Sequence, residues 1–207
     1  MKKIIIIGSG GHSRVIVDTL EQLGLAIHGI VDLNYKDEKE KIFGYEIIGD
    51  ISVLESLNPN DYNVVLAIGE NNKREEYFLR IENYGFSIAS IIHPTAVLSK
   101  KVNIGNGVFI NAGAIINAGV EIGDNTIINT GSIIEHEVKI KENCHICPGV
   151  KIAGRVIIGK NTFVGIGTSI IDYITIDESA TIGAGSVIIK NVEKYSKVAG
   201  VPGRELS

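Results

Sequence analysis

The sequence predicts a chain of two parts, an α/β domain with a small parallel sheet followed by a parallel β-helix of hexapeptide repeats. Three observations support this fold class. A glycine-rich loop separates an apolar stretch from a helical pattern near the N-terminus. Strand and helix patterns then alternate as far as His93 and Pro94. Beyond that point an isoleucine returns at every sixth residue, which is the period of a β-helix with triangular coils.

Residues 1–93 are predicted to form the first domain, a Rossmann-like α/β unit. Apolar runs typical of strands cover residues 3–7, 27–31, 63–68 and 86–91. Helical spacing of apolar side chains covers residues 13–24, 51–57 and 73–84. Strands that alternate with helices indicate a parallel sheet. About ninety residues are too few for a complete six-stranded dinucleotide fold, so we expect this domain to bind a single nucleotide diphosphate.

Residues 94–207 are predicted to form the β-helix and a C-terminal tail. A helix repeats every 3.6 residues and a strand every 2, so neither explains a strict period of six. In a β-helix each six-residue unit supplies one short strand and one corner, and three units close a coil. The repeating side chain fills the interior, and a small or β-branched residue two positions earlier packs beside it. The repeating residues are Ile104, Ile110, Ile116, Ile122, Ile128, Ile134, Ile140, Ile146, Ile152, Ile158, Val164, Ile170, Ile176, Ile182 and Ile188.

Composition and charge exclude several classes of partner. The net charge is −4 without a basic stripe, which argues against nucleic acid. No apolar run approaches the roughly 20 residues that span a membrane, so no membrane partner is expected. Cys144 and Cys147 form a single CxxC, and without a second pair we expect no metal site; Cys144 falls on the inward column. Few cysteines and no export signal indicate the cytoplasm.

The loop near the N-terminus is a candidate phosphate site. Glycines between a strand and a helix let backbone N–H groups approach a phosphate, and the helix N-terminus adds partial positive charge. His12 at the helix start is suited to donate to a phosphate or sugar oxygen, and Asp32 ends the next strand where a carboxylate reaches a ribose hydroxyl. A tight turn without a ligand is the alternative. The loop consists of Gly8, Ser9, Gly10 and Gly11.

His136 is the candidate general base. It occupies a corner of the β-helix between Glu135 and Glu137, and a flanking carboxylate keeps an imidazole basic and orients it for proton abstraction. One coil is eighteen residues, so Gly154 lies one strand spacing away. A glycine there leaves room for a thioester, and its N–H is a candidate oxyanion donor. The alternative is a solvated surface histidine.

Two further polar residues belong to this part of the sequence. Asn129 occupies another corner, one repeat before His136, and is a candidate for substrate binding. His145 precedes inward-facing Ile146, so it should point out of a face of the β-helix, where a neighbouring subunit can meet it. A structural asparagine and a plain surface histidine are the alternatives.

Motifs along the whole chain match a known family. They are Gly-Ser-Gly-Gly-His-Ser at 8–13, Val-Asp at 31–32, Ala-Ile-Gly-Glu-Asn at 67–71, Ile-Ile-His-Pro-Thr-Ala at 91–96, Asn-Thr-Gly-Ser-Ile-Ile-Glu-His-Glu at 129–137 and Ala-Gly-Val-Pro-Gly at 199–203. On these motifs the sequence resembles the sugar O-acyltransferases of the sialic acid O-acetyltransferase type. Within that family it is most similar to the N-acetyltransferases of UDP-4-amino-4,6-dideoxy sugars in bacillosamine biosynthesis.

The resemblance implies a left-handed β-helix, a nucleotide-sugar-binding first domain, and a homotrimer with acetyl-CoA between adjacent β-helices. It implies that His136 is the base, oriented by Glu137, with Asn129 nearby and the N–H of Gly154 as oxyanion donor. The Gly8–Gly11 loop and His12 would hold the nucleotide sugar, with Asp32 at its base or ribose. The residues implied along the CoA channel are His145, Gly154, Ile166, Gly183, Ala184 and Gly185.

Two details distinguish the branches of this family. The resemblance to the bacillosamine enzymes implies an Asp-Asp pair at the end of the second strand. Here the pair is Asp32-Leu33, so a nucleotide other than UDP is an alternative. Sialic acid O-acetyltransferases tend to lack the second glutamate of Glu-His-Glu. The presence of Glu137 therefore favours an amine acceptor over a hydroxyl.

The sequence thus predicts an acetyl-CoA-dependent N-acetyltransferase of a nucleotide-linked 4-amino-dideoxy sugar, with UDP as the expected nucleotide, which serves bacterial glycan biosynthesis. Transfer is expected to be direct, because no serine or cysteine lies beside the base as an obvious nucleophile. O-Acetylation of a sialic-acid-like sugar is the second hypothesis. A β-helix that serves as a binding or assembly scaffold without catalysis is the third.

Overall fold

The computed structural model describes residues 2–35 and 41–206 and divides into two compact units, Met1–Pro94 and Thr95–Ser207. The sequence-based boundary lies one residue earlier, after residue 93. The first unit contains the α/β elements. In chain order they are β1 (Lys3–Ile7), α1 (Gly11–Gln22), β2 (Ile27–Val31), β3 (Lys41–Ile42), β4 (Tyr45–Gly49), the 3-10 helix η1 (Ile51–Ser56), β5 (Tyr62–Leu66), α2 (Asn71–Asn83) and β6 (Ser87–Ile88).

These strands form one sheet in the order β3-β4-β2-β1-β5-β6. Strands β4, β2, β1, β5 and β6 are parallel, as the strand–helix alternation predicts. The β3–β4 hairpin, which is antiparallel, was not predicted; a two-residue strand and a half-buried one give little alternation to detect. The predicted last strand at 86–91 is instead two short ones, β6 and β7 (Ile91–Ile92).

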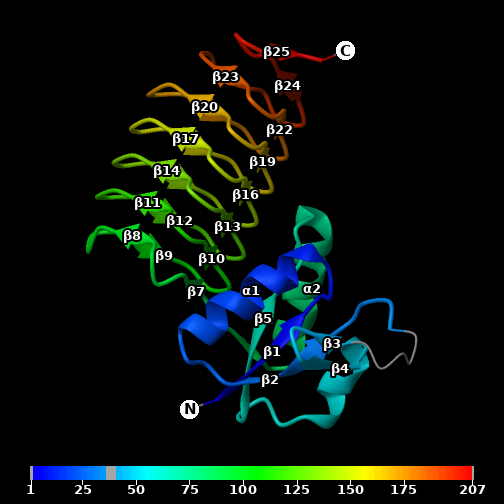
Figure 1. Ribbon diagram of the computed structural model, residues 1–207. Coiled ribbons are helices and arrows are strands. Elements are labelled where there is room, and N and C mark those ends of the chain that lie inside the picture. The colour runs from blue at the N-terminus through cyan, green and yellow to red at the C-terminus, as the bar shows by residue number, and fades with distance from the viewer. Residues whose placement is uncertain (1, 36–40, 207) are drawn as a thin grey trace. The chain divides into compact units, whose positions relative to one another are not determined.

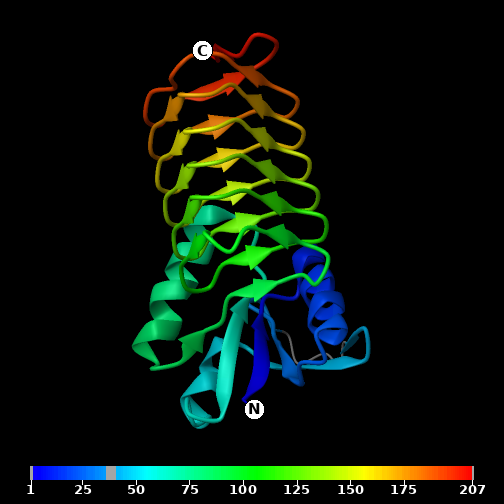
Figure 2. The same ribbon diagram turned by 90° about the vertical axis from the view of Figure 1, so that its left-hand side faces the viewer.

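The order in which strands are added to this sheet reverses at β1. The chain runs from β1 through α1 to β2 on one side of β1, and it later adds β5 on the other side, so α1 and α2 cover opposite faces of the sheet (Figure 2). Helix α1 buries Ile16, Val17 and Leu20, whereas α2 and η1 pack on a cluster around Ile5 and Val64. Ligands of open α/β sheets bind where the loops diverge at such a reversal, here after β1 and β5.

The second unit is a β-helix whose two-residue strands stack in register every eighteen residues (Figure 1). Its strands are β8 (Val97–Leu98), β9 (Asn103–Ile104), β10 (Phe109–Ile110), β11 (Ile115–Ile116), β12 (Glu121–Ile122), β13 (Ile127–Ile128), β14 (Ile133–Ile134), β15 (Lys139–Ile140), β16 (His145–Ile146), β17 (Lys151–Ile152), β18 (Ile157–Ile158), β19 (Phe163–Val164), β20 (Ser169–Ile170), β21 (Thr175–Ile176), β22 (Thr181–Ile182), β23 (Val187–Ile188), β24 (Lys197–Ala199) and β25 (Arg204–Glu205).

Three parallel sheets form the faces of the β-helix. Their orders are β25-β24-β22-β19-β16-β13-β10-β7, β23-β20-β17-β14-β11-β8 and β21-β18-β15-β12-β9, with only the last pair β24–β25 antiparallel. The repeating residues from Ile110 to Ile188 are buried, which confirms their predicted inward orientation, whereas Ile104 in the first coil is only partly buried. Inward hydroxyl groups are satisfied by a carbonyl of the next coil, as in the hydrogen bonds from Thr126 to Lys141 O and from Ser132 to Cys147 O, both 3.1 Å.

Each corner contains one residue in the left-handed backbone conformation, and the three corners fill this position differently. The first uses glycine throughout, at Gly113, Gly131, Gly149, Gly167 and Gly185. The second begins with Gly107 and continues with Asn125, Asn143, Asn161 and Ser179. The third contains Gly119, Glu137, Arg155 and Tyr173. Most L-residues lose about 1–2 kcal/mol in this conformation, with asparagine less affected, so glycine and asparagine are expected there. The backbone alone does not explain the third column.

Candidate active site

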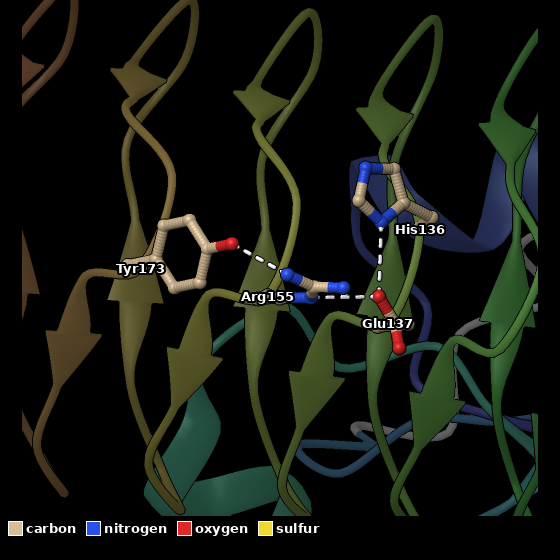
Figure 3. A network of polar contacts seen from close by, with 4 residues as sticks. All are labelled: His136, Glu137, Arg155 and Tyr173. Atoms are coloured by element: carbon tan, nitrogen blue, oxygen red, sulfur yellow. Dashed lines mark hydrogen bonds and ion pairs between the residues drawn. The ribbon is translucent and has the colours of Figure 1, made fainter.

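His136 lies on the third corner with its ring over the backbone of the next coil. Its Nδ1 is 3.3 Å from Oε2 of Glu137 (Figure 3). A carboxylate accepts hydrogen bonds only, so the neutral imidazole carries its proton on Nδ1 and leaves Nε2 unprotonated. The side chain of His136 is 56% exposed, so the ring lies at the surface of the β-helix. The pair has the arrangement of a general base with an orienting carboxylate.

Gly154 lies directly beneath the His136 ring, as the eighteen-residue coil predicts. A Cβ atom on Gly154 would lie 2.6 Å from Cε1 and 2.7 Å from Nε2 of His136. The room left by the glycine is therefore filled by the imidazole, rather than kept open for a thioester. The backbone N–H groups of Ala153 and Arg155 donate to Ile170 O and His136 O, whereas that of Gly154 donates to no backbone carbonyl among the described residues.

Glu137 is held from a second side. Nε of Arg155, one coil further along, donates to the same Oε2 at 2.8 Å, and Nη1 of Arg155 donates to the hydroxyl of Tyr173 (Figure 3). The Arg155 hydrogen bond, and secondly that to His136, lowers the pKa of Glu137 below its ordinary value. The hydrogen bond to Glu137, and secondly that to Tyr173, raises the pKa of Arg155 above its ordinary value. Glu137 is thus a fixed, ionised partner of the imidazole across the neutral pH range.

Asn129 and His145 meet at a different corner from His136. Nδ2 of Asn129 lies 3.3 Å from Nε2 of His145. Oδ1 of Asn129 accepts from Nδ2 of Asn111 at 3.0 Å and from the N–H of Thr130 at 2.8 Å, which identifies Nδ2 as the atom that faces the imidazole. An amide nitrogen only donates, so Nε2 of His145 accepts, and its neutral ring is protonated on Nδ1.

Of the residues implied along the CoA channel, Gly154 lies beneath His136 on the third corner, whereas the others follow one track at this first corner. Gly149 N donates to Thr130 O, Gly167 N to Pro148 O and Gly185 N to Ile166 O, each across one coil at 2.8–2.9 Å. Asn129, Ile166 and the segment 183–185 therefore lie on successive coils of one edge. Ile166 is 57% exposed, an apolar side chain on the surface of this track. Within one chain the track and His136 are on separate corners.

The two cysteines are free and buried. Cys144 is fully buried with its Sγ 3.0 Å from Gly159 O, which confirms the inward position predicted for it. Burial raises the pKa of Cys147 to about 11, so its thiol is protonated at neutral pH. Neither thiol is suited to act as a nucleophile.

The fold requires glycine at only some of the positions in the N-terminal loop. Gly8 adopts φ +112°, and a Cβ there would lie 2.9 Å from Ala67 O, so the fold itself requires glycine. For Gly10 and Gly11 a Cβ would meet nothing within 4 Å. Carbonyls of Ser9 and Gly10 accept from Nη1 of Arg14. Gly10 caps α1 without a side-chain hydrogen bond, whereas Glu70 caps α2 through Asn72 N and Lys73 N.

His12 lies in the first turn of α1 and is half-buried. Asp32 follows β2, and its Oδ1 accepts from Asn34 N at 2.9 Å, so one carboxylate oxygen is engaged in a local turn. The loop after β5 is braced by Arg74, a 1% exposed residue of α2 that sequence reasoning missed. Its Nη1 donates to Ile68 O and Gly69 O, both at 3.2 Å.

Sequence reasoning also missed Arg155 and Tyr173. The signal was available, because the eighteen-residue step that places Gly154 beneath His136 also places Arg155 beneath Glu137. Within residues 2–35 and 41–206, no group of three or more His, Cys, Asp or Glu is arranged to hold a metal ion. No helix of the described chain is long and apolar enough to cross a membrane.

Comparison with known families agrees with both units. Residues 3–81 match the PglD N-terminal domain, and residues 101–136 and 119–154 match the bacterial transferase hexapeptide repeats. The molecule is thus a hexapeptide transferase that carries a PglD-type N-terminal domain.

Similar proteins narrow this class. Perosamine N-acetyltransferase from Caulobacter crescentus, solved with CoA and GDP-perosamine, is 33% identical with a TM-score of 0.95, covering 100% of this chain and 98% of that one. The acetyltransferase domain of PglB from Neisseria gonorrhoeae, solved with acetyl coenzyme A, is 31% identical with a TM-score of 0.93, covering 99% of each chain. The UDP-N-acetylbacillosamine N-acetyltransferase of Bacillus subtilis is 33% identical over 114 residues, 54% of this chain and 52% of that protein.

The match thus spans about half the length of the curated B. subtilis relative. With one-third identity over the whole length of the C. crescentus enzyme, the chain belongs to the hexapeptide-repeat family of amino-sugar N-acetyltransferases. This confirms the resemblance and the left-handed β-helix fold class predicted from the sequence.

Proposed function

We propose that this protein transfers the acetyl group of acetyl-CoA to the amine of a nucleotide-linked 4-amino sugar for glycan biosynthesis. The observation that carries the proposal is the His136–Glu137 pair seated on Gly154, with Nε2 of His136 unprotonated and the ring at the surface of the β-helix. The relatives that acetylate GDP-perosamine and a UDP-linked bacillosamine precursor support the choice of acceptor.

In the proposed reaction the free amine attacks the thioester carbonyl and forms a tetrahedral intermediate. Nε2 of His136 takes a proton from the amine nitrogen, and Glu137 stabilises the resulting imidazolium. The N–H of Gly154 is the proposed donor to the oxyanion. The C–S bond then breaks, the CoA thiolate takes the proton from the imidazolium, and the amide and CoA leave. No acyl-enzyme forms, which agrees with two buried thiols.

The nucleotide sugar is proposed to bind at the Gly8–Gly11 loop. Helix α1 begins there without a side-chain cap, so its first N–H groups and partial positive charge suit a diphosphate. Helix α2 is capped by the carboxylate of Glu70, which disfavours an anion. His12 is proposed to contact the phosphate or sugar, and Asp32 retains one carboxylate oxygen for the ribose or base.

We further propose a homotrimer. The catalytic pair lies on one corner of the β-helix, whereas Asn129, His145 and the track through Ile166, Gly183, Ala184 and Gly185 lie on another. A CoA molecule that runs along the track reaches a His136 only if a second copy brings its third corner beside it. Closed three-fold symmetry makes three such sites equivalent. A cytoplasmic location is part of the proposal, supported by the need for acetyl-CoA.

The test is CoA release from acetyl-CoA with a panel of acceptors, namely GDP-perosamine, a UDP-linked 4-amino-4,6-dideoxy sugar, a dTDP-linked amino sugar and CMP-sialic acid. We expect turnover only with an amino sugar, and thermal stabilisation by the accepted nucleotide sugar. Acetylation of CMP-sialic acid alone would replace the proposal with O-acetylation. Absence of turnover with every acceptor, alongside intact acetyl-CoA binding, would contradict it.

Sedimentation of the active protein tests the assembly. We expect a trimer at working concentration, with activity lost when the subunits separate. A fully active monomer would contradict the shared site and the role given to His145.

A matched pair of variants tests the N-terminal site. Gly10→Ala should weaken nucleotide-sugar binding about tenfold or more, because a phosphate can approach the backbone closely only where there is no Cβ atom. The melting temperature should be unchanged, because the added Cβ meets no protein atom. Gly44→Ala, at a glycine elsewhere in the same unit whose Cβ would also meet no atom within 4 Å, is the control for affinity; its φ of +90° means that this variant should lose stability but not nucleotide-sugar affinity. Equal losses of acetyl-CoA and nucleotide-sugar affinity for Gly10→Ala would contradict the assignment of the sugar to this loop.

A further inference from the structure

Arg155 makes a contact for which the fold gives no reason. It occupies the left-handed position of its corner at φ +59°, where the equivalent position on the first corner is always glycine. On the second corner the side chains of Asn125, Asn143 and Asn161 are joined by hydrogen bonds from one coil to the next. Arg155 is 48% exposed and Glu137 is 53% exposed, and an ion pair between such side chains contributes little to stability. A strained position filled by a charged residue indicates a role beyond folding.

The geometry connects Arg155 to the catalytic pair through one atom. Oε2 of Glu137 accepts hydrogen bonds both from Nε of Arg155, at 2.8 Å, and from Nδ1 of His136, at 3.3 Å. Arg155 is itself fixed by the hydroxyl of Tyr173, over whose ring its guanidinium lies 5.5 Å from the centroid. The column Glu137, Arg155 and Tyr173 thus holds the carboxylate in the rotamer that meets the imidazole (Figure 3).

Two opposite consequences follow for the imidazole. The fixed carboxylate orients the ring and keeps the proton on Nδ1, which favours Nε2 as the base. The guanidinium draws charge from the shared oxygen and adds a positive charge near the ring, which disfavours the imidazolium. The other charged groups around His136 are Glu135 beside it in sequence and Glu137 itself; the backbone beneath it is Gly154.

We propose that Arg155 is a positioning residue for the transfer reaction, which acts through Glu137 to orient the ring of His136. This inference rests on the proposed function for its kinetic consequences. Its structural core, the coupling of Arg155 to the His136 ring through the Glu137 carboxylate, is measurable in the free protein.

The first measurement is therefore independent of activity. The ring resonances of His136, assigned by their loss in His136→Asn, are titrated by NMR in the wild type and in Arg155→Gln. We expect the midpoint to rise in the variant, because the change removes a positive charge that shares the Glu137 carboxylate oxygen with the imidazole. An unchanged or lowered midpoint would overturn the proposal, whether or not the protein acetylates a sugar.

The second measurement is the pH profile of kcat with acetyl-CoA and whichever of GDP-perosamine or the UDP-linked 4-amino sugar is the better acceptor. Arg155→Gln should move the acid limb of kcat to higher pH and lower kcat about tenfold at its optimum, with KM for both substrates within about threefold. Arg155→Lys should restore the position of the acid limb, because it restores the charge, and only part of kcat, because it lacks the planar fork. A loss confined to KM would assign Arg155 to substrate binding instead.

A double-mutant cycle decides whether Arg155 acts through Glu137. In Glu137→Gln the further change Arg155→Gln should alter kcat less than twofold, since the intermediary carboxylate is gone. Additive losses would overturn the proposal. Tyr173→Phe removes the hydroxyl that fixes Arg155 and should shift the acid limb in the same direction as Arg155→Gln, by a smaller amount. If the wild type transfers acetyl to no sugar, the proposed function fails while the NMR titration still tests the coupling.

Discussion

Two corners of the β-helix use the same left-handed backbone with different side chains. On one, Nδ2 of Asn125 donates to Oδ1 of Asn143, and Nδ2 of Asn143 donates to Oδ1 of Asn161, both at 2.8 Å. On the other, Glu137 and Arg155 form an exposed chain that leads to His136. Asn125 and Asn143 are buried, whereas the catalytic corner is about half exposed.

The difference separates a structural use of a repeat from a functional one. A buried asparagine ladder links successive coils by side-chain hydrogen bonds and tolerates the left-handed conformation, so it stabilises the stack of coils. An exposed chain of charges adds little to stability and accepts backbone strain in order to fix one imidazole. Substitutions in the two columns should therefore have opposite signatures, one in stability and the other in activity.

The largest effect is expected at the catalytic corner. His136→Ala should lower kcat by about 10² to 10⁴-fold, the usual contribution of a general base, while the affinity for the nucleotide sugar stays nearly intact. Steady-state kinetics and calorimetric titration with the nucleotide sugar measure the two quantities. A variant that keeps the wild-type kcat would remove His136 from the mechanism.

Gly154→Ala tests the seat of the imidazole. The new Cβ would lie 2.6 Å from Cε1 of His136, so the ring must move, and a displacement of about 1 Å in a catalytic group costs about 10²-fold in rate. The melting temperature should change little, because the clash is with a half-exposed side chain. The matched control is Gly159→Ala, whose Cβ would meet Glu178 N at 2.4 Å. Gly159→Ala should lose stability, since the backbone it meets cannot move aside. If the two variants had equal losses of kcat and equal stability, Gly154 would have no special role in positioning the imidazole.

The asparagine ladder gives the opposite signature. Asn143→Ala removes hydrogen bonds on both sides of a buried position and places alanine at φ +58°, so it should destabilise the protein by about 2–3 kcal/mol. Asn143→Gly removes the same hydrogen bonds without the backbone strain and should lose about 1 kcal/mol less. Denaturant unfolding measures both losses, and kcat of the folded protein should be unchanged. A fall in kcat without destabilisation would end the distinction between the two corners.

The smallest effect is expected at Cys147. Burial raises the pKa of this thiol to about 11, so at pH 7 its reactive thiolate form is about 10⁻⁴ of the population. Cys147→Ala should retain kcat within about twofold, and iodoacetamide should label the folded protein at pH 7 far more slowly than the unfolded protein. Loss of transfer in this variant with unchanged stability would indicate a covalent intermediate.

Much of the fold could be predicted from the sequence because its physical causes are periodic. The inward isoleucines, the eighteen-residue coil and the pairing of His136 with Gly154 all follow from counting, since each hexad repeats the same geometry without insertion. Strands β1 and β2 were predicted with the bounds that the structure has, because each is a mostly apolar run. The ends of α1 and α2 differ by one or two residues from prediction, because capping shifts helix ends locally.

Only the tertiary structure decided the contacts that depend on side-chain rotamers and on packing between distant segments. Counting places Arg155 beneath Glu137, but only the folded chain shows that one carboxylate oxygen is shared between guanidinium and imidazole. The packing of Ala67 against Gly8, with Gly10 open, separates a glycine that the fold requires from one that the fold does not require. Counting places Asn129 on another corner than His136, but only the folded chain shows that its side-chain amide meets the imidazole of His145.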